Sequence, residues 1–348
     1  MEEIIMKKKL LITGGAGFIG TNSANYFADH DYEVTIFDNF MRYGTKDNVD
    51  WLLSKHPHIQ IIKGDIRKAS EISKAVPGHD VVLHLAAQVA VTTSVTDPRT
   101  DFEINALGTF NVLEAVRKLK SKPIVIYSST NKVYGGMEDI EIIEENKQYR
   151  YKDYKFGISE NMALDFHSPY GCSKGAADQY VRDYGRIYDF PTVVLRQSCI
   201  YGPHQFGIED QGWVAWFIIA TTLGKPIVVY GDGKQVRDVL YVDDLIRLYS
   251  TVIEKISTAK GKVYNAGGGI HNILSVWTSF GPILEKLFGR KLSVTFKDWR
   301  PGDQKVYVSD IRKVKKELDW EPNVSVEKGV ERLFNWVNAN KSLFNKFI

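Results

Sequence analysis

A tyrosine and a lysine four residues apart are the residues best suited to chemistry in this sequence, within Ser168-Pro-Tyr-Gly-Cys-Ser-Lys174. Serine suits a helix N-cap and proline the first helical position, so the spacing predicts that Tyr170 and Lys174 share one helical face. A phenol loses its proton near pH ~10, and a neighbouring ammonium group lowers that pKa. Such a tyrosine can accept a proton from a hydroxyl group whose carbon loses hydride. The alternative is an ordinary amphipathic helix.

A glycine-rich turn, Gly14-Gly-Ala-Gly17-Phe-Ile-Gly20, follows the apolar residues 10–13 and opens a helical pattern. Glycines let a pyrophosphate approach the backbone, and the amide groups of a helix N-terminus bind its charge. The next apolar run ends at Asp38, where a carboxylate can accept the ribose hydroxyls of NAD and repel the extra phosphate of NADP. Arg42 is the only nearby cation that argues otherwise. We predict an NAD site with these contacts: Gly14, Gly17, Phe18, Ile19, Gly20, Asp38 and Asn39.

Apolar residues 59–62 and 81–85, separated by helical stretches, predict further βα units and therefore a parallel sheet with helices on both faces. Ligands of such sheets bind beyond the carboxyl ends of the strands. His84 lies inside its strand, so we interpret it as a packed core residue. Asn105, within helical residues 102–118, is either a buried structural amide or orients the active-site helix. The further cofactor-binding candidates are Asp65, Ile66, Leu85, Ala86, Gln88, Asn105 and Ser128, together with Tyr170 and Lys174.

Hydroxyl groups follow the apolar strand 123–127, in Ser128-Ser-Thr130-Asn-Lys132. A hydroxyl just past a strand end can hydrogen-bond the same substrate oxygen that Tyr170 deprotonates, and Thr130 is the best candidate. Alternatively, these hydroxyls only cap the following turn.

For the remaining segments, the sequence predicts structural elements rather than chemistry. Residues 137–167 are polar and weakly periodic, as in a long excursion near the site rather than a core element. The Tyr170 helix should bury a stripe of Ala177, Val181, Tyr184 and Tyr188. Residues 192–195 predict another strand, and residues 326–337 a packed terminal helix without chemistry of its own.

Composition excludes several classes of protein. With 348 residues, of which 44% are hydrophobic, the chain can fill a large α/β core. A balance of 45 basic and 42 acidic residues gives a net charge of +3, which argues against a nucleic-acid or membrane surface. Cys172 and Cys199 form no CxxC pair, so no metal site is expected. Residues 1–9 lack a signal-peptide pattern, and we predict a cytoplasmic protein.

Four motifs together resemble an extended short-chain dehydrogenase/reductase that modifies nucleotide sugars: residues 13–20, Tyr127-Ser-Ser-Thr130, Tyr170-x-x-x-Lys174 and Arg300-Pro-Gly-Asp303. The resemblance covers nearly the whole chain. It implies a Rossmann-like doubly wound sheet of seven strands in residues 1–197, with residues 238–268 returning to it. A smaller C-terminal α/β lobe, mainly residues 198–348, would bind the nucleotide sugar.

The family also implies tightly held NAD and a catalytic Thr130, Tyr170 and Lys174. Residues 129–135, 167–180 and 198–216 resemble epimerases that invert C2 of a CDP-linked 3,6-dideoxyhexose of lipopolysaccharide O-antigen, by oxidation and hydride return. Dehydratases of this superfamily have Asp-Glu after the catalytic threonine, whereas this chain has Asn131-Lys132. The alternatives are a UDP-hexose 4-epimerase, another sugar-nucleotide dehydrogenase of this superfamily, or a non-catalytic NAD-sensing scaffold. The 4-epimerase is less favoured, because that group usually has asparagine where this chain has residues 197–199.

Two arginines are candidates for the substrate diphosphate, because the planar guanidinium binds phosphate through two hydrogen bonds. They are Arg237 and Arg300, and their alternative is exposure at the surface. The full set of substrate-binding candidates is Thr130, Gln211, Arg237, Arg300 and Asp303. The resemblance also implies a homo-oligomer, a dimer or a tetramer, with helices packed into a four-helix bundle.

Overall fold

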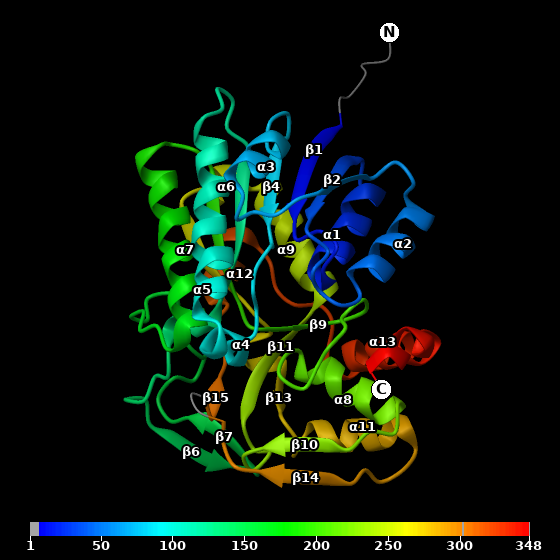
Figure 1. The fold of residues 1–348 in the computed structure, drawn as a ribbon. Helices are drawn as coiled ribbons and strands as arrows, with labels where there is room; N and C mark the ends of the chain where they lie inside the picture. Colours follow the sequence, from blue (N-terminus) through cyan, green and yellow to red (C-terminus); the bar gives the residue numbers. More distant parts are fainter. Residues whose placement is uncertain (1–6, 301–302, 348) are drawn as a thin grey trace.

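The computed structural model describes residues 7–300 and 303–347 (Figure 1). Its centre is a seven-stranded parallel sheet in the order β12-β8-β5-β4-β1-β2-β3. The strands are β1 (Lys8–Thr13), β2 (Tyr32–Asp38), β3 (Gln60–Lys63), β4 (Val81–His84), β5 (Ile124–Thr130), β8 (Thr192–Gln197) and β12 (Lys262–Ala266). The direction of winding reverses beside β1, where ligands of such sheets bind. The predicted Rossmann-like fold is confirmed.

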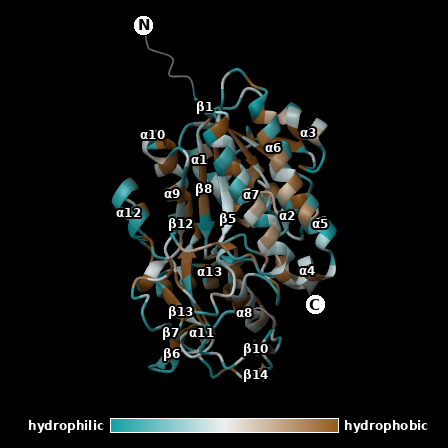
Figure 2. Cartoon of the chain, turned by 90° about the vertical axis from the view of Figure 1, so that its left-hand side faces the viewer, coloured by the Kyte–Doolittle hydropathy of each residue, from teal (hydrophilic) through white to brown (hydrophobic). Residues whose placement is uncertain are grey.

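Alternating side chains of the strands build a core on each face of the sheet. Leu10 and Ile12 of β1 pack on one face, and Leu11 packs on the other. The first face is covered by α1 (Phe18–Asp29), α2 (Thr45–Lys55) and α9 (Val242–Glu254), and the second by α3 (Ala69–Ala75), α6 (Gly108–Arg117) and α7 (Ser168–Ile187). In Figure 2, hydrophobic segments lie along the strands, and the surrounding helices contain both hydrophobic and hydrophilic turns.

The helical stretch predicted over residues 102–118 is divided into several elements. After α4 (Val91–Thr96) and α5 (Pro98–Phe102), a π-helical turn, η1 (Glu103–Leu107), leads into α6. A π-turn adds one residue to a helical turn and is often found at functional sites. Here it contains Asn105, which is buried.

The buried stripe of α7 differs from the prediction at one end. Ala177, Val181 and Tyr184 are buried, whereas Tyr188 is 43% exposed. Helix α7 ends at Ile187, so Tyr188 lies outside the helix. The guanidinium of Arg117 lies 5.3 Å from the ring centroid of Tyr188. The prediction that Tyr188 is buried was wrong, since Tyr188 lies just past the end of α7 and its ring contacts Arg117 and Tyr184 at the surface.

The C-terminal lobe, defined here as the strands outside the large sheet with helices α8 and α11, lies below that sheet in Figure 1. Strand β11 lies between β13 and β15 and also pairs with β9, whereas β10 pairs with β14. The lobe therefore contains two separate sheets besides the β6–β7 hairpin. Its elements are β6 (Ile142–Glu145), β7 (Gln148–Tyr151), β9 (Cys199–Tyr201), β10 (Ile227–Tyr230), β11 (Val236–Tyr241), β13 (Ile273–Ser275), β14 (Val294–Lys297), β15 (Val306–Tyr307), α8 (Trp213–Thr222) and α11 (Phe280–Phe288).

The remaining helices are η2 (Asn131–Tyr134), α10 (Ile256–Ala259), η3 (Gly269–His271), α12 (Arg312–Leu318), α13 (Val326–Ala339) and η4 (Lys341–Phe347). Helix α13 is the predicted terminal helix, and Val330, Leu333 and Val337 are its fully buried residues.

Residues 137–167 contribute more to packing than their polarity predicts. Ile158 is fully buried and Tyr151 is 4% exposed, and both belong to a core cluster with Tyr134 and Tyr307. The Tyr151 hydroxyl donates to the Val306 carbonyl at 2.9 Å. The expectation that this excursion contains no core element was wrong, because isolated apolar residues in it pack against strand β15.

Over residues 7–300 and 303–347, no helix is long and apolar enough to cross a membrane. The signal-peptide prediction concerns mainly residues 1–6, which lie outside the described residues.

Candidate active site

Three buried side chains meet beyond the carboxyl end of β5. Thr130 is the last residue of that strand, and Tyr170 and Lys174 lie in the first two turns of α7. Their exposed fractions are 8%, 8% and 4%. The Lys174 ammonium group donates to the Ser128 carbonyl at 2.6 Å and lies 4.4 Å from the ring centroid of Tyr127. The structure thus brings the predicted Thr, Tyr and Lys together at the end of a central strand.

The start of α7 explains how Tyr170 is positioned. Ser168 has a φ of +68°, outside the helical region, and its hydroxyl accepts from the Gly171 N–H at 3.2 Å. This is the bond expected of an N-cap, although the helical hydrogen-bond pattern already includes Ser168. The Tyr170 N–H in turn donates to the Ser94 hydroxyl of α4 at 3.1 Å. These two bonds fix the first turn and therefore the phenol.

Burial dominates the acid–base properties of the pair. It raises the pKa of Tyr170 to about 12, against smaller lowering effects of the Thr130 hydroxyl and Arg42. It also lowers the pKa of Lys174 to about 7, although Asp178 and Asp101 favour the charged form. The sequence argument that Lys174 lowers the tyrosine pKa is therefore not sufficient here, because loss of hydration is the larger effect.

A buried polar network lies behind the pair. Asn105 donates to Asp101 Oδ1 and to Ser173 Oγ, each at 3.1 Å, and accepts from the Gln88 N–H at 2.9 Å. Ser173 also donates to Asp101 Oδ2 at 2.5 Å. Of the two roles predicted for Asn105, this arrangement favours orientation of α7, because the side chain joins α5, the residues after β4 and the active-site helix.

An ion pair that sequence reasoning missed lies under the same helix. Arg196 of β8 donates to both carboxylate oxygens of Asp178, at 2.9 and 3.0 Å, and the side chains are 2% and 0% exposed. The Ser129 hydroxyl donates to the same carboxylate at 2.8 Å. In the sequence, this ion pair could have been inferred from Arg196, which directly follows the apolar run 192–195. An arginine at the end of a buried strand is itself buried, and a buried cation requires a partner.

The glycine turn is closely packed against the strand ends. Gly14 has a φ of +70°, and a Cβ there would lie 2.7 Å from the Ala86 nitrogen. A Cβ at Gly20 would lie 2.3 Å from the Gly14 carbonyl oxygen, and one at Gly17 3.2 Å from it. Helix α1 begins at Phe18 and Ile19 without a side-chain cap. Its N-terminal amide groups are therefore not occupied by a capping side chain, and the turn fits a pyrophosphate.

Asp38 lies at the end of β2 beside this turn. Its carboxylate accepts from the Ala16 N–H at 3.1 Å and from the Phe40 N–H at 2.8 Å. Burial raises its pKa, and these backbone bonds act in the opposite direction. The neighbouring Asn39 amide donates to Asp65 Oδ2 at 3.2 Å, so the ends of β2 and β3 are joined.

The other predicted cofactor contacts follow β3, β4 and β5. Leu85 and Ala86 donate their backbone N–H groups to Thr13, to its carbonyl and its hydroxyl. Ile66 is buried against Gly108, where a Cβ would lie 2.6 Å from its Cδ1. His84 lies between the Thr13 and Thr109 hydroxyls, at 2.7 and 3.0 Å, and burial lowers its pKa to about 3. Its interpretation as a core residue is confirmed.

The predicted substrate residues pair with other protein groups. Arg237 of β11 donates to Asp303 Oδ1 at 2.7 Å, and Arg300 lies 2.9 Å from Asp210 Oδ1. The Arg300 guanidinium also stacks on Tyr230, 3.8 Å from the ring centroid. Gln211 accepts from Arg42, which bridges the loop after β2 and the loop before α8. The two arginines are thus held by carboxylates rather than exposed freely.

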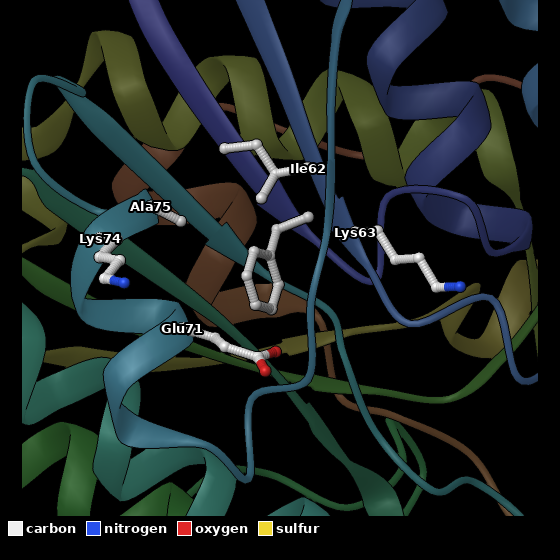
Figure 3. A pocket seen from close by; sticks show the side chains of 6 residues that line it. Ile62, Lys63, Glu71, Lys74 and Ala75 are labelled. Carbon is white, nitrogen blue, oxygen red and sulfur yellow. The ribbon is translucent and has the colours of Figure 1, made fainter.

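A small cavity lies apart from these residues, between the end of β3 and α3 (Figure 3). It measures about 210 Å³ and is lined by Phe37, Ile62, Lys63, Glu71, Lys74 and Ala75. None of the predicted site residues lines it. Among the described residues, no group of three or more His, Cys, Asp or Glu side chains could hold a metal ion.

The family is shown by comparison with known proteins. Residues 11–333 match the family model described as GDP-mannose 4,6 dehydratase. The chain belongs to this family of short-chain dehydrogenases/reductases, whose members act on nucleotide sugars.

One relative and two solved structures, all of nucleotide-sugar enzymes, are similar to nearly the whole chain. The chain is 44% identical to a CDP-paratose 2-epimerase of Salmonella typhi over 338 residues, which are 95% of this chain and 99% of that protein. Among solved structures, a dTDP-glucose 4,6-dehydratase of Streptomyces venezuelae with NAD bound has a TM-score of 0.84 at 27% identity, covering 98% and 100% of the two chains. A UDP-glucuronic acid 4-epimerase mutant of Bacillus cereus with NAD has a TM-score of 0.82 at 29% identity, covering 95% and 99%. The protein is an NAD-dependent nucleotide-sugar enzyme.

Proposed function

We propose that the protein is a CDP-paratose 2-epimerase, which converts CDP-paratose to CDP-tyvelose. The single observation that carries this proposal is the 44% identity to such an enzyme over 95% of the chain. The complete Thr130, Tyr170 and Lys174 set supports catalysis over a scaffold role. Asn131-Lys132, where dehydratases have Asp-Glu, argues against dehydration.

In the proposed mechanism Tyr170 takes the proton from the C2 hydroxyl, and Thr130 shares the hydrogen bond to that oxygen. The chemistry supplied by bound NAD would be transient acceptance of hydride from the substrate carbon and its return. The positive charge of oxidised nicotinamide would favour the Tyr170 phenolate, which burial alone disfavours. Lys174 would hold the nicotinamide ribose and support the phenolate.

We assign the cofactor to the crevice beside β1. The glycine turn and the uncapped start of α1 would bind the pyrophosphate, and Asp38 and Asn39 the adenosine ribose. Residues after the strands would line the adenine and nicotinamide: Asp65, Ile66, Leu85, Ala86, Gln88 and Ser128. A carboxylate that already accepts two backbone bonds has lone pairs left for a ribose hydroxyl, which supports Asp38 in this role.

The substrate would lie between the large sheet and the C-terminal lobe. Arg237 and Arg300 would bind the diphosphate, and Gln211 and Asp303 would complete the nucleotide and sugar contacts. Each arginine now pairs with a carboxylate, which the diphosphate would replace as partner. We further propose residues 1–197 with 238–268 as the NAD-binding domain, residues 198–348 as mainly the substrate lobe, and a cytoplasmic enzyme of O-antigen synthesis.

We propose a homodimer in which α6 and α7 of one subunit pack against the same helices of the other. A tetramer would consist of two such dimers. Both helices carry large exposed hydrophobic residues, including Phe110 at 36%, Tyr180 at 48% and Ile187 at 66%. An exposed apolar face of this kind is typical of an interaction surface. Light scattering should give twice the monomer mass or more, and a monomer would contradict the assembly.

A substrate screen tests the proposal. Purified holoenzyme is incubated with CDP-paratose, UDP-glucose and dTDP-glucose, and products are separated by chromatography. We expect CDP-tyvelose from CDP-paratose, and thermal stabilisation by CDP-sugars because a ligand of the folded state raises its stability. Inversion of UDP-glucose at C4 without turnover of CDP-paratose would instead support the alternative function, a UDP-hexose 4-epimerase. The observation behind this alternative is the similarity of the chain to a putative UDP-glucose 4-epimerase and to the solved structure of another.

A further inference from the structure

Lys132 is a partly buried cation beside the proposed catalytic threonine. It is the second residue of η2, directly after β5, and its backbone N–H donates to the Thr130 hydroxyl at 3.3 Å. Its ammonium group donates to Gln304 Oε1, a neutral acceptor, at 3.2 Å. Gln304 is itself fixed, since it is 4% exposed and donates to the Gly135 carbonyl at 2.5 Å. The lysine thus joins the end of β5 to the C-terminal lobe.

The charges around Lys132 leave an excess of positive charge. Arg237 faces it from β11 and lowers its pKa, whereas Asp303 and Cys199 act in the opposite direction. Burial has the largest effect, and the pKa falls to about 8. Arg237 already pairs with Asp303 at 2.7 Å, and within the described residues no ion pair involves Lys132. A bound anion would therefore stabilise two cations that share one carboxylate.

The chemistry of the proposed substrate indicates which anion this is. In a nucleotide sugar, only C1 and one bridging oxygen separate C2 from the nearer phosphorus atom, whereas C4 is two carbons farther away. An enzyme that reacts at C2 must therefore hold the sugar-linked phosphate close to its catalytic threonine. Lys132 lies at that place, with Thr130 on one side and Arg237 on the other.

We propose that Lys132 binds the sugar-linked phosphate of the substrate and acts as a positioning residue that keeps this phosphate beside the reacting carbon. The inference rests on the proposed function and adds a residue to it. While the oxidised sugar turns its other face to the cofactor, Lys132 and Arg237 hold the diphosphate.

Calorimetric titration of holoenzyme with CDP and CMP tests this role, because CMP lacks the phosphate in question. Lys132→Gln removes the charge and keeps a polar group near Gln304. Since hydrogen bonds to charged groups contribute about 1.5–3 kcal/mol, we expect at least ~10-fold weaker CDP binding with CMP binding unchanged. Lys132→Arg should restore most of the CDP affinity. The matched control is Lys291→Gln, a side chain that is 92% exposed in the C-terminal lobe, and it should change neither affinity.

Equal losses for CDP and CMP, or no loss for either, would overturn the proposal. Unchanged NAD content and melting temperature identify a folded variant, and Lys132→Met provides a second uncharged variant if Gln destabilises the protein. In turnover, we expect a lower kcat as well as a higher KM, because a loosely held phosphate misplaces C2. If the wild type binds UDP or dTDP and not CDP, the proposed substrate fails, and the same comparison with UMP or dTMP still tests Lys132.

Discussion

Burial shifts the pKa values of the two proposed acid–base residues, Tyr170 and Lys174, in opposite directions. The pKa of Tyr170 rises to about 12 and that of Lys174 falls to about 7, so near pH 7 the site without cofactor holds a neutral phenol and an amine that is about half protonated. A positive charge brought into this site would favour the phenolate strongly, because the surroundings screen it little. NAD in its oxidised form carries that charge. We therefore propose that bound NAD makes Tyr170 competent for proton transfer.

Tyr170→Phe removes the proton acceptor with little change of ring volume. We expect NAD retention and folding to persist and turnover to fall at least ~100-fold, the low end for the loss of a general base. Tyr154→Phe is the control, because its side chain is 41% exposed and belongs neither to the proposed site nor to the proposed assembly surface. Wild-type turnover in Tyr170→Phe would dismiss the mechanism.

The low pKa of Lys174 predicts a pH dependence of stability. Its pKa is about 7 in the folded protein and about 10.4 in an unfolded chain. The folded state therefore disfavours the charged lysine fully below pH 7, and this penalty disappears as pH rises toward 10. Cofactor-free wild type should gain stability relative to Lys174→Met over pH 7 to 10, measured by urea unfolding. A constant difference would contradict the assignment.

Asp38→Ala tests the proposed ribose contact. Loss of the carboxylate should weaken NAD binding and reduce the discrimination against NADP, because the repulsion of the extra phosphate is removed. Retained cofactor after purification and competition between NAD and NADP are the measurements. Asp50→Ala on the exposed face of α2 is the control. Unchanged cofactor content and preference would exclude Asp38 from the ribose.

Among the elements, helix α7 depends on side chains that come from distant parts of the sequence. Asp101 and Asn105 hold Ser173, and Arg196 and Ser129 hold Asp178. These contacts lie on the same helix as Tyr170 and Lys174. The positions of the reacting groups on this helix therefore depend on four other elements: α5, η1, β5 and β8.

Arg196→Met should destabilise the protein by about 3–5 kcal/mol, because it leaves Asp178 charged and buried without its partner. The double variant Asp178→Leu/Arg196→Met should recover much of that loss, since it removes both charges. Chemical denaturation measures both. Lys328→Met breaks the exposed Lys328–Glu331 pair and should cost less than about 1 kcal/mol. Equal stability of the single and double variants would contradict this account of the ion pair.

Local patterns were sufficient to predict a parallel sheet with helices on both faces, whereas its seven strands were expected from the family resemblance. The roles of the site residues stay predictions, although the structure brings Thr130, Tyr170 and Lys174 together. The glycine turn, the apolar strands and the Tyr170–Lys174 spacing depend on neighbours in sequence, and the fold confirms the strands and helices predicted from them. The π-turn at Asn105 and the choice of Asp178 as the partner of Arg196 depend on long-range packing, whereas the apolar run before Arg196 indicated only that this arginine needs a partner. The exposure of Tyr188 and Tyr151 was also predicted wrongly from sequence. Tyr188 is exposed because it lies past the end of α7, and Tyr151 is buried because it packs against a distant strand.

For the whole molecule, the proposed reaction requires two lobes with separate tasks. The large sheet presents Tyr170, Lys174 and the cofactor crevice, and the C-terminal lobe presents Arg237 and Arg300. Lys132 and Arg42 connect the two through Gln304 and Gln211. With the diphosphate anchored to one lobe and the cofactor to the other, the planar C2 ketone can turn between them.

Deuterium at C2 of CDP-paratose tests the central claim most directly. If hydride leaves C2 and returns to the same carbon, mass spectrometry and NMR should find the deuterium retained at C2 of CDP-tyvelose, even in ordinary water. Product without deuterium at C2 would indicate proton abstraction next to a carbonyl and exchange with solvent. That result would contradict transient oxidation at C2 by this enzyme.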